Sequence, residues 1–129
     1  MISESLYKKI SISGAFLLWF TWTYLVNQES EIVLISAIAQ GLSSSIITSF
    51  MITANGNLYH RFDELSSKIL MPPIIIFLVC LTLGYVVHTI IGTTHILETL
   101  SPALAVGFVF SLITCLRINR NNYEENRDV

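Results

Sequence analysis

Polar side chains deep inside apolar stretches are the first places in this sequence where chemistry is expected. Gln40 is the most polar of them, and Ser36, Ser44 and Thr48 lie at multiples of four positions from it. On a helix this spacing places all four side chains on one face. The face predicts either a polar path or ligand site within a membrane, or hydrogen bonds to a neighbouring helix, worth roughly 0.6–2 kcal/mol per contact.

Two histidines form a second candidate group. His88 lies near the end of the third apolar stretch, and His95 lies in the connection that follows it. Imidazole groups titrate close to physiological pH, so a pH-sensitive pair at the outer membrane face is one interpretation of the two side chains. The alternative interpretation is that they are interfacial histidines with no role of their own.

The sequence offers no candidate for a catalytic residue. Residues 10–26, 32–54, 69–91 and 99–116 contain no Asp, Glu, Lys or Arg, which argues against a carboxylate-driven proton antiporter within one chain and against an intramembrane aspartyl enzyme. No HExxH, GxSxG or P-loop spacing is present. We therefore expect no catalytic residue, no metal site and no cofactor. Cys80 and Cys115 are interpreted as buried small side chains, because neither lies in a CxxC pattern.

The composition indicates that transmembrane helices position the polar residues named above. Of 129 residues 53% are hydrophobic and only 12% are charged, with a mean hydropathy of +0.65, whereas a soluble domain carries about 25% charged residues. We expect one all-α integral membrane domain over residues 1–129. Four apolar runs predict its transmembrane helices, at residues 10–26, 32–54, 69–91 and 96–116. The first run is interpreted as an uncleaved helix rather than a signal peptide.

The helix ends are predicted from turn-forming and charged residues. Residues 55–57, Asn-Gly-Asn, are expected to end the second helix, and the charged segment 58–68 is predicted to form a short amphipathic helix on the membrane surface. The prolines at 72–73 are placed in the first turn of the third helix. Pro102 either bends a helix that begins near Ile96 or is its first residue, and the remaining tail, from residue 117 to 129, is expected to be disordered beyond its first turn.

The distribution of positive charge predicts the orientation. All seven basic residues lie on one predicted side of the membrane: Lys8, Lys9, Arg61, Lys68, Arg117, Arg120 and Arg127. The two opposite connections carry only the acids Glu29, Glu31 and Glu98. By the positive-inside rule both termini are expected in the cytoplasm, and we expect the membrane to be the inner membrane of a bacterium.

Small residues recur in a way that predicts an internal repeat. Ala37, Gly41 and Ser45 are spaced by four, and the same types return 66 positions later as Ala103, Gly107 and Ser111. Small residues at this spacing let helix backbones approach closely. They predict that the second helix packs against the fourth, or each against its copy in a dimer, within a four-helix transmembrane bundle of two tandem hairpins. Because both hairpins start on the same side, the repeat is expected to be parallel.

The architecture resembles two groups of small membrane proteins. Asn55 followed by Phe62 and Asp63 is similar to the end of the first hairpin in the proteobacterial antimicrobial compound efflux family. This chain departs from that family because Ala54 replaces a tryptophan and residues 16–17 lack the membrane-embedded glutamate, so proton coupling is not carried over. Size, span number and orientation also resemble the GtrA-like lipid-linked sugar flippase components, for which no diagnostic motif is present.

These observations lead to a functional expectation with one alternative. We expect a small transport-type protein that exports or flips an amphiphile or a lipid-linked solute. The alternative is a non-transporting accessory, regulatory, immunity or exclusion subunit. Four short spans enclose little volume, so we expect a homodimer or a larger membrane protein partner within the lipid bilayer. No basic stripe predicts binding of nucleic acid.

Overall fold

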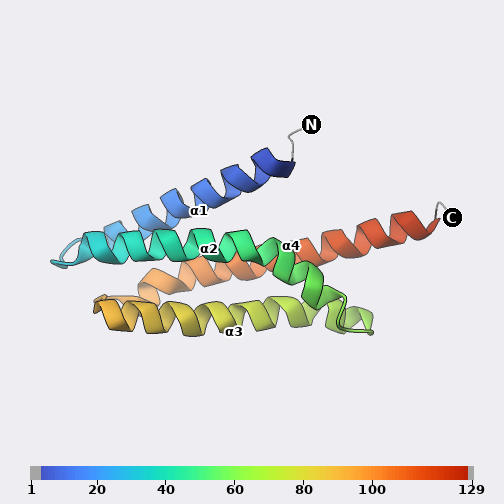
Figure 1. Ribbon diagram of the computed structural model, residues 1–129. Helices are drawn as coiled ribbons and strands as arrows, with labels where there is room; N and C mark the ends of the chain where they lie inside the picture. The colour runs from blue at the N-terminus through green and yellow to red at the C-terminus, as the bar shows by residue number, and fades with distance from the viewer. Residues whose placement is uncertain (1–3, 128–129) are drawn as a thin grey trace.

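A computed structural model describes residues 4–127, which form an all-α four-helix bundle (Figure 1). All four helices within this range are long and apolar enough to cross a membrane. The prediction of four candidate transmembrane helices is therefore confirmed, and they suggest an integral membrane protein. The helices are α1 (Glu4–Val26), α2 (Val33–Tyr59), α3 (Leu65–Ile91) and α4 (Ile96–Arg127).

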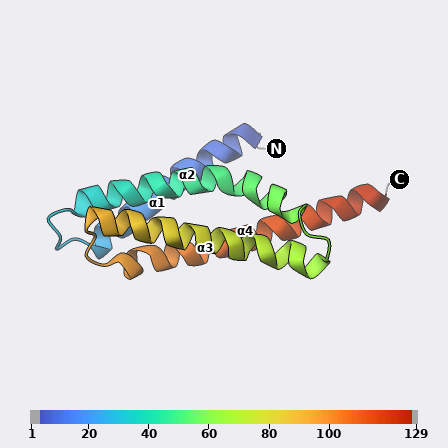
Figure 2. The ribbon, with the colours of Figure 1, turned by 60° about the horizontal axis from the view of Figure 1, so that its bottom comes forward.

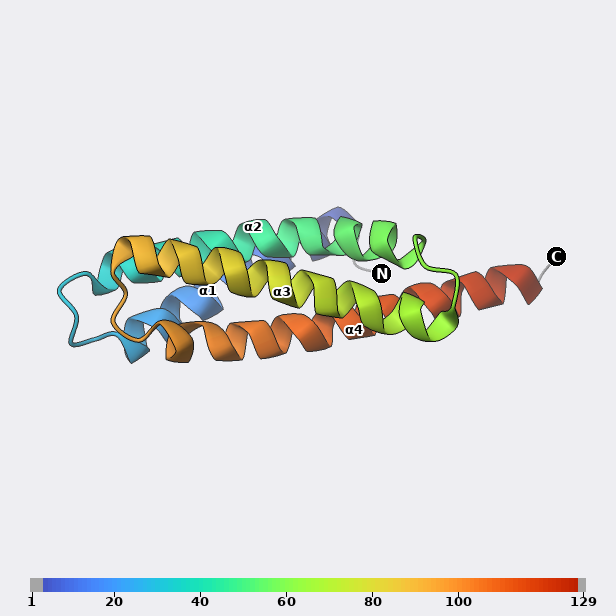
Figure 3. The same cartoon turned by 90° about the horizontal axis from the view of Figure 1, so that it is seen from below.

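The helices run up and down, so that the loops 27–32 and 92–95 meet at one end, which we call the hairpin end. The loop 60–64 and both ends of the described chain lie toward the opposite end, the terminal end (Figure 2). Helix α2 contacts each of the other three helices, whereas α1 and α3 share no contact within the described chain. Helix α1 diverges from the bundle toward its N-terminus, and the end of α4 extends past the other helices (Figures 1 and 3).

Two glycines set the close approaches within the hairpins. A Cβ atom at Gly41 of α2 would lie 2.9 Å from the ring of Phe16 in α1, and one at Gly84 of α3 would lie 2.9 Å from the Leu100 side chain in α4. Helix α3 then ends at Gly92, whose φ of 82° is the left-handed conformation that favours glycine.

The small-residue positions of α2 have a different partner from the one expected within the chain, whereas those of α4 face α2 as expected. Gly41 packs on Phe16, and the Ser45 hydroxyl donates to the Ile12 carbonyl at 3.2 Å, so this part of α2 faces α1 and not α4. The positions in α4 do face α2: Gly107 lies closest to Met51, and Ser111 bonds to Asn55. The two sets of small residues thus pack against different neighbours rather than against each other.

The predicted break at residues 55–57 is wrong, because α2 continues to Tyr59. Asn55 is fully buried, and its side chain accepts a hydrogen bond from Ser111 of α4 instead of competing with its own backbone. The predicted surface helix over 58–68 is also wrong: residues 58–59 end α2, residues 60–64 form a loop, and residues 65–68 begin α3.

The prolines at 72–73 and the tail differ from expectation as well, whereas the start of α4 agrees with one of its two predicted alternatives. The buried prolines at 72–73 lie about two turns inside α3 rather than in its first turn, because α3 begins at Leu65. Helix α4 begins at Ile96, so Pro102 lies within it and is not its first residue. The segment expected to be disordered is helical through Arg127. No Gly or Pro between 117 and 127 interrupts it, and Tyr59 of α2 holds its first part by bonding to Asn119.

Candidate functional site

A buried chain of hydrogen bonds crosses the bundle near the hairpin end. The imidazole of His88 in α3 is fully buried, with Nε2 2.8 Å from Gln40 Oε1 and Nδ1 2.7 Å from Thr93 Oγ1. Thr93, in the α3–α4 loop, also lies 2.9 Å from Ser36 Oγ. The four residues, Ser36, Thr93, His88 and Gln40, are called here the polar chain, and they connect α2 to the second hairpin.

Elementary hydrogen-bond chemistry gives the polar chain a direction. An amide oxygen only accepts, so His88 Nε2–H must donate to Gln40 Oε1. A neutral imidazole then has only Nδ1 left as an acceptor, which receives the Thr93 hydroxyl proton. Thr93 Oγ1 in turn accepts from Ser36. Each proton therefore points along the chain from Ser36 toward Gln40, and the amide oxygen of Gln40 is committed to His88.

Gln40 also lines a partly open cavity of about 230 Å³ to which all four helices contribute residues. The α2 side of this cavity carries neutral polar groups, namely those of Gln40, Ser43, Ser44 and Thr48. The sides contributed by the other helices are mainly apolar, with Leu18 of α1, Ile76 of α3 and Leu104 of α4 among their residues. This arrangement suits an elongated ligand that is apolar over most of its surface and polar on one side.

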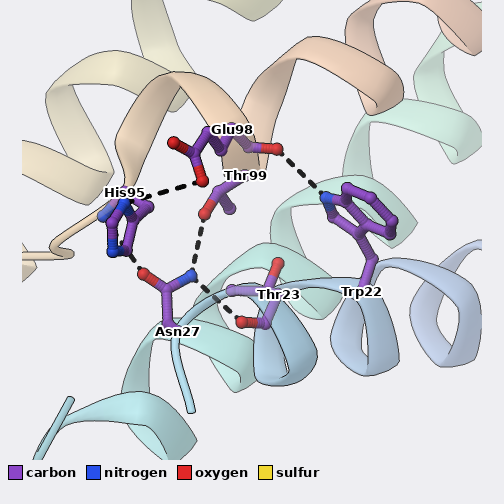
Figure 4. Close-up of polar contacts among 6 residues, drawn as sticks. All are labelled: Trp22, Thr23, Asn27, His95, Glu98 and Thr99. Carbon is purple, nitrogen blue, oxygen red and sulfur yellow. Dashed lines mark hydrogen bonds and ion pairs between the residues drawn. The ribbon is translucent and has the colours of Figure 1, made fainter. Parts of the chain in front are cut away.

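A second polar group fastens α1 to α4 at the hairpin end (Figure 4). The buried Asn27 amide donates to the Thr23 carbonyl at 3.0 Å and to Thr99 Oγ1 at 2.9 Å, while its oxygen accepts from the His95 backbone N–H at 3.2 Å. Trp22 Nε1 donates to the Glu98 carbonyl at 3.1 Å. These bonds join the first hairpin to the second where α1 is closest to α4.

A third polar group lies toward the terminal end, between α2 and α4. Asn55 Oδ1 accepts from Ser111 Oγ and, at 3.6 Å, from Cys115 Sγ. One helical turn further, Tyr59 Oη donates to Asn119 Oδ1 at 2.8 Å. Helix α1 takes no part in these bonds, which join α2 to α4.

The predicted polar face is divided between two environments. Ser36 and Gln40 belong to the polar chain, whereas Ser44 and Thr48 line the cavity. Among the small residues predicted to pack helices, Ala103 and Gly107 also line this cavity, and Ala37 is fully buried. The structure therefore brings three of the four residues of the predicted polar face, Gln40, Ser44 and Thr48, to one cavity, and Gln40 belongs to both environments.

The two histidines do not form a pair. His88 is buried against Gln40, whereas His95 is about half exposed, with Nδ1 3.6 Å from Glu98 Oε2. Sequence analysis missed the central positions of Thr93 and Asn27. Both residues can form hydrogen bonds and lie directly beside the end of an apolar run, which is the one feature that could have indicated them. Neither their spacing nor their charge distinguishes them from ordinary loop residues.

No protein-family model, curated protein or solved structure matches this chain. Function is therefore inferred from its own residues.

Proposed function

We propose that this protein is a small four-span membrane protein that binds an amphiphile between its helices and moves it across or out of the bilayer. The observation that carries the proposal is the cavity of about 230 Å³, which is mainly apolar where α1, α3 and α4 line it and is lined on α2 by Gln40, Ser43, Ser44 and Thr48. An amphiphile matches this division of the lining into apolar and polar parts. Its chain would contact the apolar side chains, and its polar end would contact the polar side chains of α2. Binding and transport, rather than catalysis, suit a cavity lined by neutral side chains.

The proposed orientation places both termini in the cytoplasm of a bacterial cell. It is supported by the seven basic residues, which all lie in α1 before its apolar part, in or beside the 60–64 loop, or near the end of α4. The hairpin end, with its polar chain, would then face the outside. The tandem parallel repeat remains part of the proposal and rests on the recurrence of small residues after 66 positions.

An accessory role is the second candidate, and the length of α4 favours it. Helix α4 has 32 residues and extends past the other helices (Figure 1), so its last turns offer a helical surface to a larger membrane protein. A homodimer would instead supply more enclosed volume for transport. In this second role the polar chain would serve packing alone, and the protein purified without its partner would not move an amphiphile.

The first experiment compares Gln40→Leu with Gln28→Leu in proteoliposomes that contain fluorescent single-chain amphiphiles. Gln28 is exposed in the 27–32 loop, so its replacement makes the same chemical change outside the cavity. We expect Gln40→Leu to weaken binding or slow translocation by about 3- to 30-fold, the value of one lost membrane hydrogen bond, and Gln28→Leu to have no effect. Absence of binding and translocation by the folded parent protein would exclude the transport proposal.

A further inference from the structure

We infer that the ligand of the cavity is an uncharged single-chain amphiphile whose head group accepts a hydrogen bond from the Gln40 amide. This inference rests on the proposed function and specifies its substrate class. Three observations support it: the charge of the cavity lining, the orientation of Gln40, and the cavity volume.

The cavity lining contains no charged residue. Its polar members are Ser11, Trp19, Gln40, Ser43, Ser44 and Thr48, and no Asp, Glu, Lys, Arg or His is among the residues that line it. A phosphate, sulfate or ammonium group placed there would lose its hydration without meeting an opposite charge, which is strongly unfavourable inside a membrane protein. An ester, amide or alcohol head group has no such cost when it is hydrogen-bonded.

The polar chain determines which kind of neutral head group fits. Gln40 Oε1 is occupied by His88 Nε2–H at 2.8 Å, and within the described chain the Gln40 amide nitrogen has no hydrogen-bond partner. Gln40 therefore offers N–H groups to the cavity while its acceptor is already used. A ligand carbonyl or hydroxyl oxygen can accept from this nitrogen. His88 acts as a positioning residue, because its bond keeps the amide from turning its oxygen toward the ligand.

The volume favours a ligand that inserts a single chain. About 230 Å³ is smaller than the roughly 300–1,000 Å³ of sites that enclose drug-sized molecules. One alkyl chain with a small head group suits that space, and the cavity is partly open at the surface of the bundle. Monoacylglycerols and long-chain alcohols or amides have the required chemistry.

Trp19 provides a reporter at the site. It lines the cavity and is 9% exposed, and the chain contains only one other tryptophan, Trp22. In a Trp22→Phe protein reconstituted in bilayers, we would titrate three amphiphiles with the same brominated chain, namely a monoacylglycerol, an alkyl sulfate and an alkyl trimethylammonium. Bromine quenches indole fluorescence on contact. The monoacylglycerol is expected to quench Trp19 at a concentration at least tenfold lower than either charged compound.

Two further variants separate cavity binding from contact with surrounding lipid. Gly107→Leu fills the cavity, since a Cβ atom at Gly107 lies 3.6 Å from its nearest neighbour, Met51 Cε. Its matched control is Gly14→Leu, because Gly14 is exposed on α1 and has nothing within 4 Å of an added Cβ. Quenching by the monoacylglycerol is expected to be lost only in Gly107→Leu, and to be weakened about 3- to 30-fold by Gln40→Leu.

The outcomes distinguish this inference from the function on which it rests. Equal or tighter binding of a charged amphiphile would overturn the neutral-ligand inference and leave amphiphile binding standing. Quenching by the monoacylglycerol that Gln40→Leu does not alter would overturn the role of Gln40. If none of the three compounds quenches Trp19 more than it does in Gly107→Leu, both the inference and the proposed function fail. The comparison of the three head groups uses the unaltered cavity, so it remains decisive if Gly107→Leu does not fold.

Discussion

His88 is the residue on which the buried polar contacts of the hairpin end converge. Both ring nitrogens are used, one toward α2 through Gln40 and one toward the α3–α4 loop through Thr93. Removing the ring would leave the buried Gln40 oxygen without a partner and would remove the acceptor of the Thr93 hydroxyl proton, which is more costly than losing a hydrogen bond whose partners can return to water. The side chain therefore links the end of α3 and the α3–α4 loop to a residue of α2 that lies 48 positions away in the sequence.

His88→Leu is expected to lower the free energy of unfolding by about 1–3 kcal/mol, because the Gln40 oxygen becomes unpaired in an apolar interior and Thr93, which keeps its contact with Ser36, loses its bond to the ring. Reversible unfolding in mixed micelles would measure it. Thr89→Val is the control on the next residue of α3, since the Thr89 hydroxyl bonds only to the Tyr85 carbonyl of its own helix. Equal stability of the two variants would contradict the central role of His88.

The spacing of residues in the sequence predicted the α2 side of the candidate site. The face shared by Ser36, Gln40, Ser44 and Thr48 follows directly from the helical period. Its partner His88 could not be predicted, because the period within one apolar run does not show how α3 is rotated relative to α2. Histidine at the end of an apolar run is equally compatible with the interface, where His95 lies, and with the burial that the structure gives His88.

At the scale of elements, turn signals from soluble proteins placed the end of α2 too early and the start of α3 too late. The Asn-Gly-Asn segment at 55–57 and the prolines at 72–73 all lie inside helices. In an apolar surrounding, backbone N–H and C=O groups cannot exchange their helical bonds for water, so the helix persists. Asn55 adds a second reason, because its side chain is bonded to α4. The number and order of helices were predictable from apolar length, whereas their ends depend on contacts between helices.

Asn27→Ala is expected to release α1 from α4 at the hairpin end, because it removes the bonds to Thr99 and to the His95 backbone. The cost should be about 1–3 kcal/mol, since both partners stay buried or half-buried. Spin labels at the exposed residues Leu25 and Leu97 would report it as a broader and longer distance distribution. Gln28→Ala, on the neighbouring exposed residue, should leave the distribution unchanged. An unchanged distribution in Asn27→Ala would show that other contacts hold α1.

At the scale of the whole molecule, the two hairpins are not packed as equivalent units. Gly41 approaches Phe16 within the first hairpin, whereas its sequence counterpart Gly107 lies closest to Met51 of the other hairpin. Helix α2 contacts all three other helices, and α1 has no contact with α3 within the described chain. The repeat in sequence stays a prediction, because similar small residues serve different contacts in the two halves.

The proposed orientation makes a labelling prediction. In a protein with Cys80 and Cys115 replaced by serine, a cysteine at Gln28 or Thr94 in the hairpin-end loops should react with a membrane-impermeant maleimide in intact cells. A cysteine at His60, at the opposite end, should react only after the membrane is permeabilised. The reason is the accumulation of basic residues toward the terminal end. The reverse labelling pattern would exclude the proposed orientation.

The length of α4 also determines how far the chain reaches from the membrane. Its 32 residues measure about 48 Å at 1.5 Å per residue, and the hydrocarbon layer is about 30 Å thick. If α4 starts at the outer boundary of that layer, roughly its last 12 residues stand clear of it as a continuous rod. A fluorescent protein or binding domain attached there would be held at a defined distance from the lipid head groups, whereas a flexible linker would let it approach them.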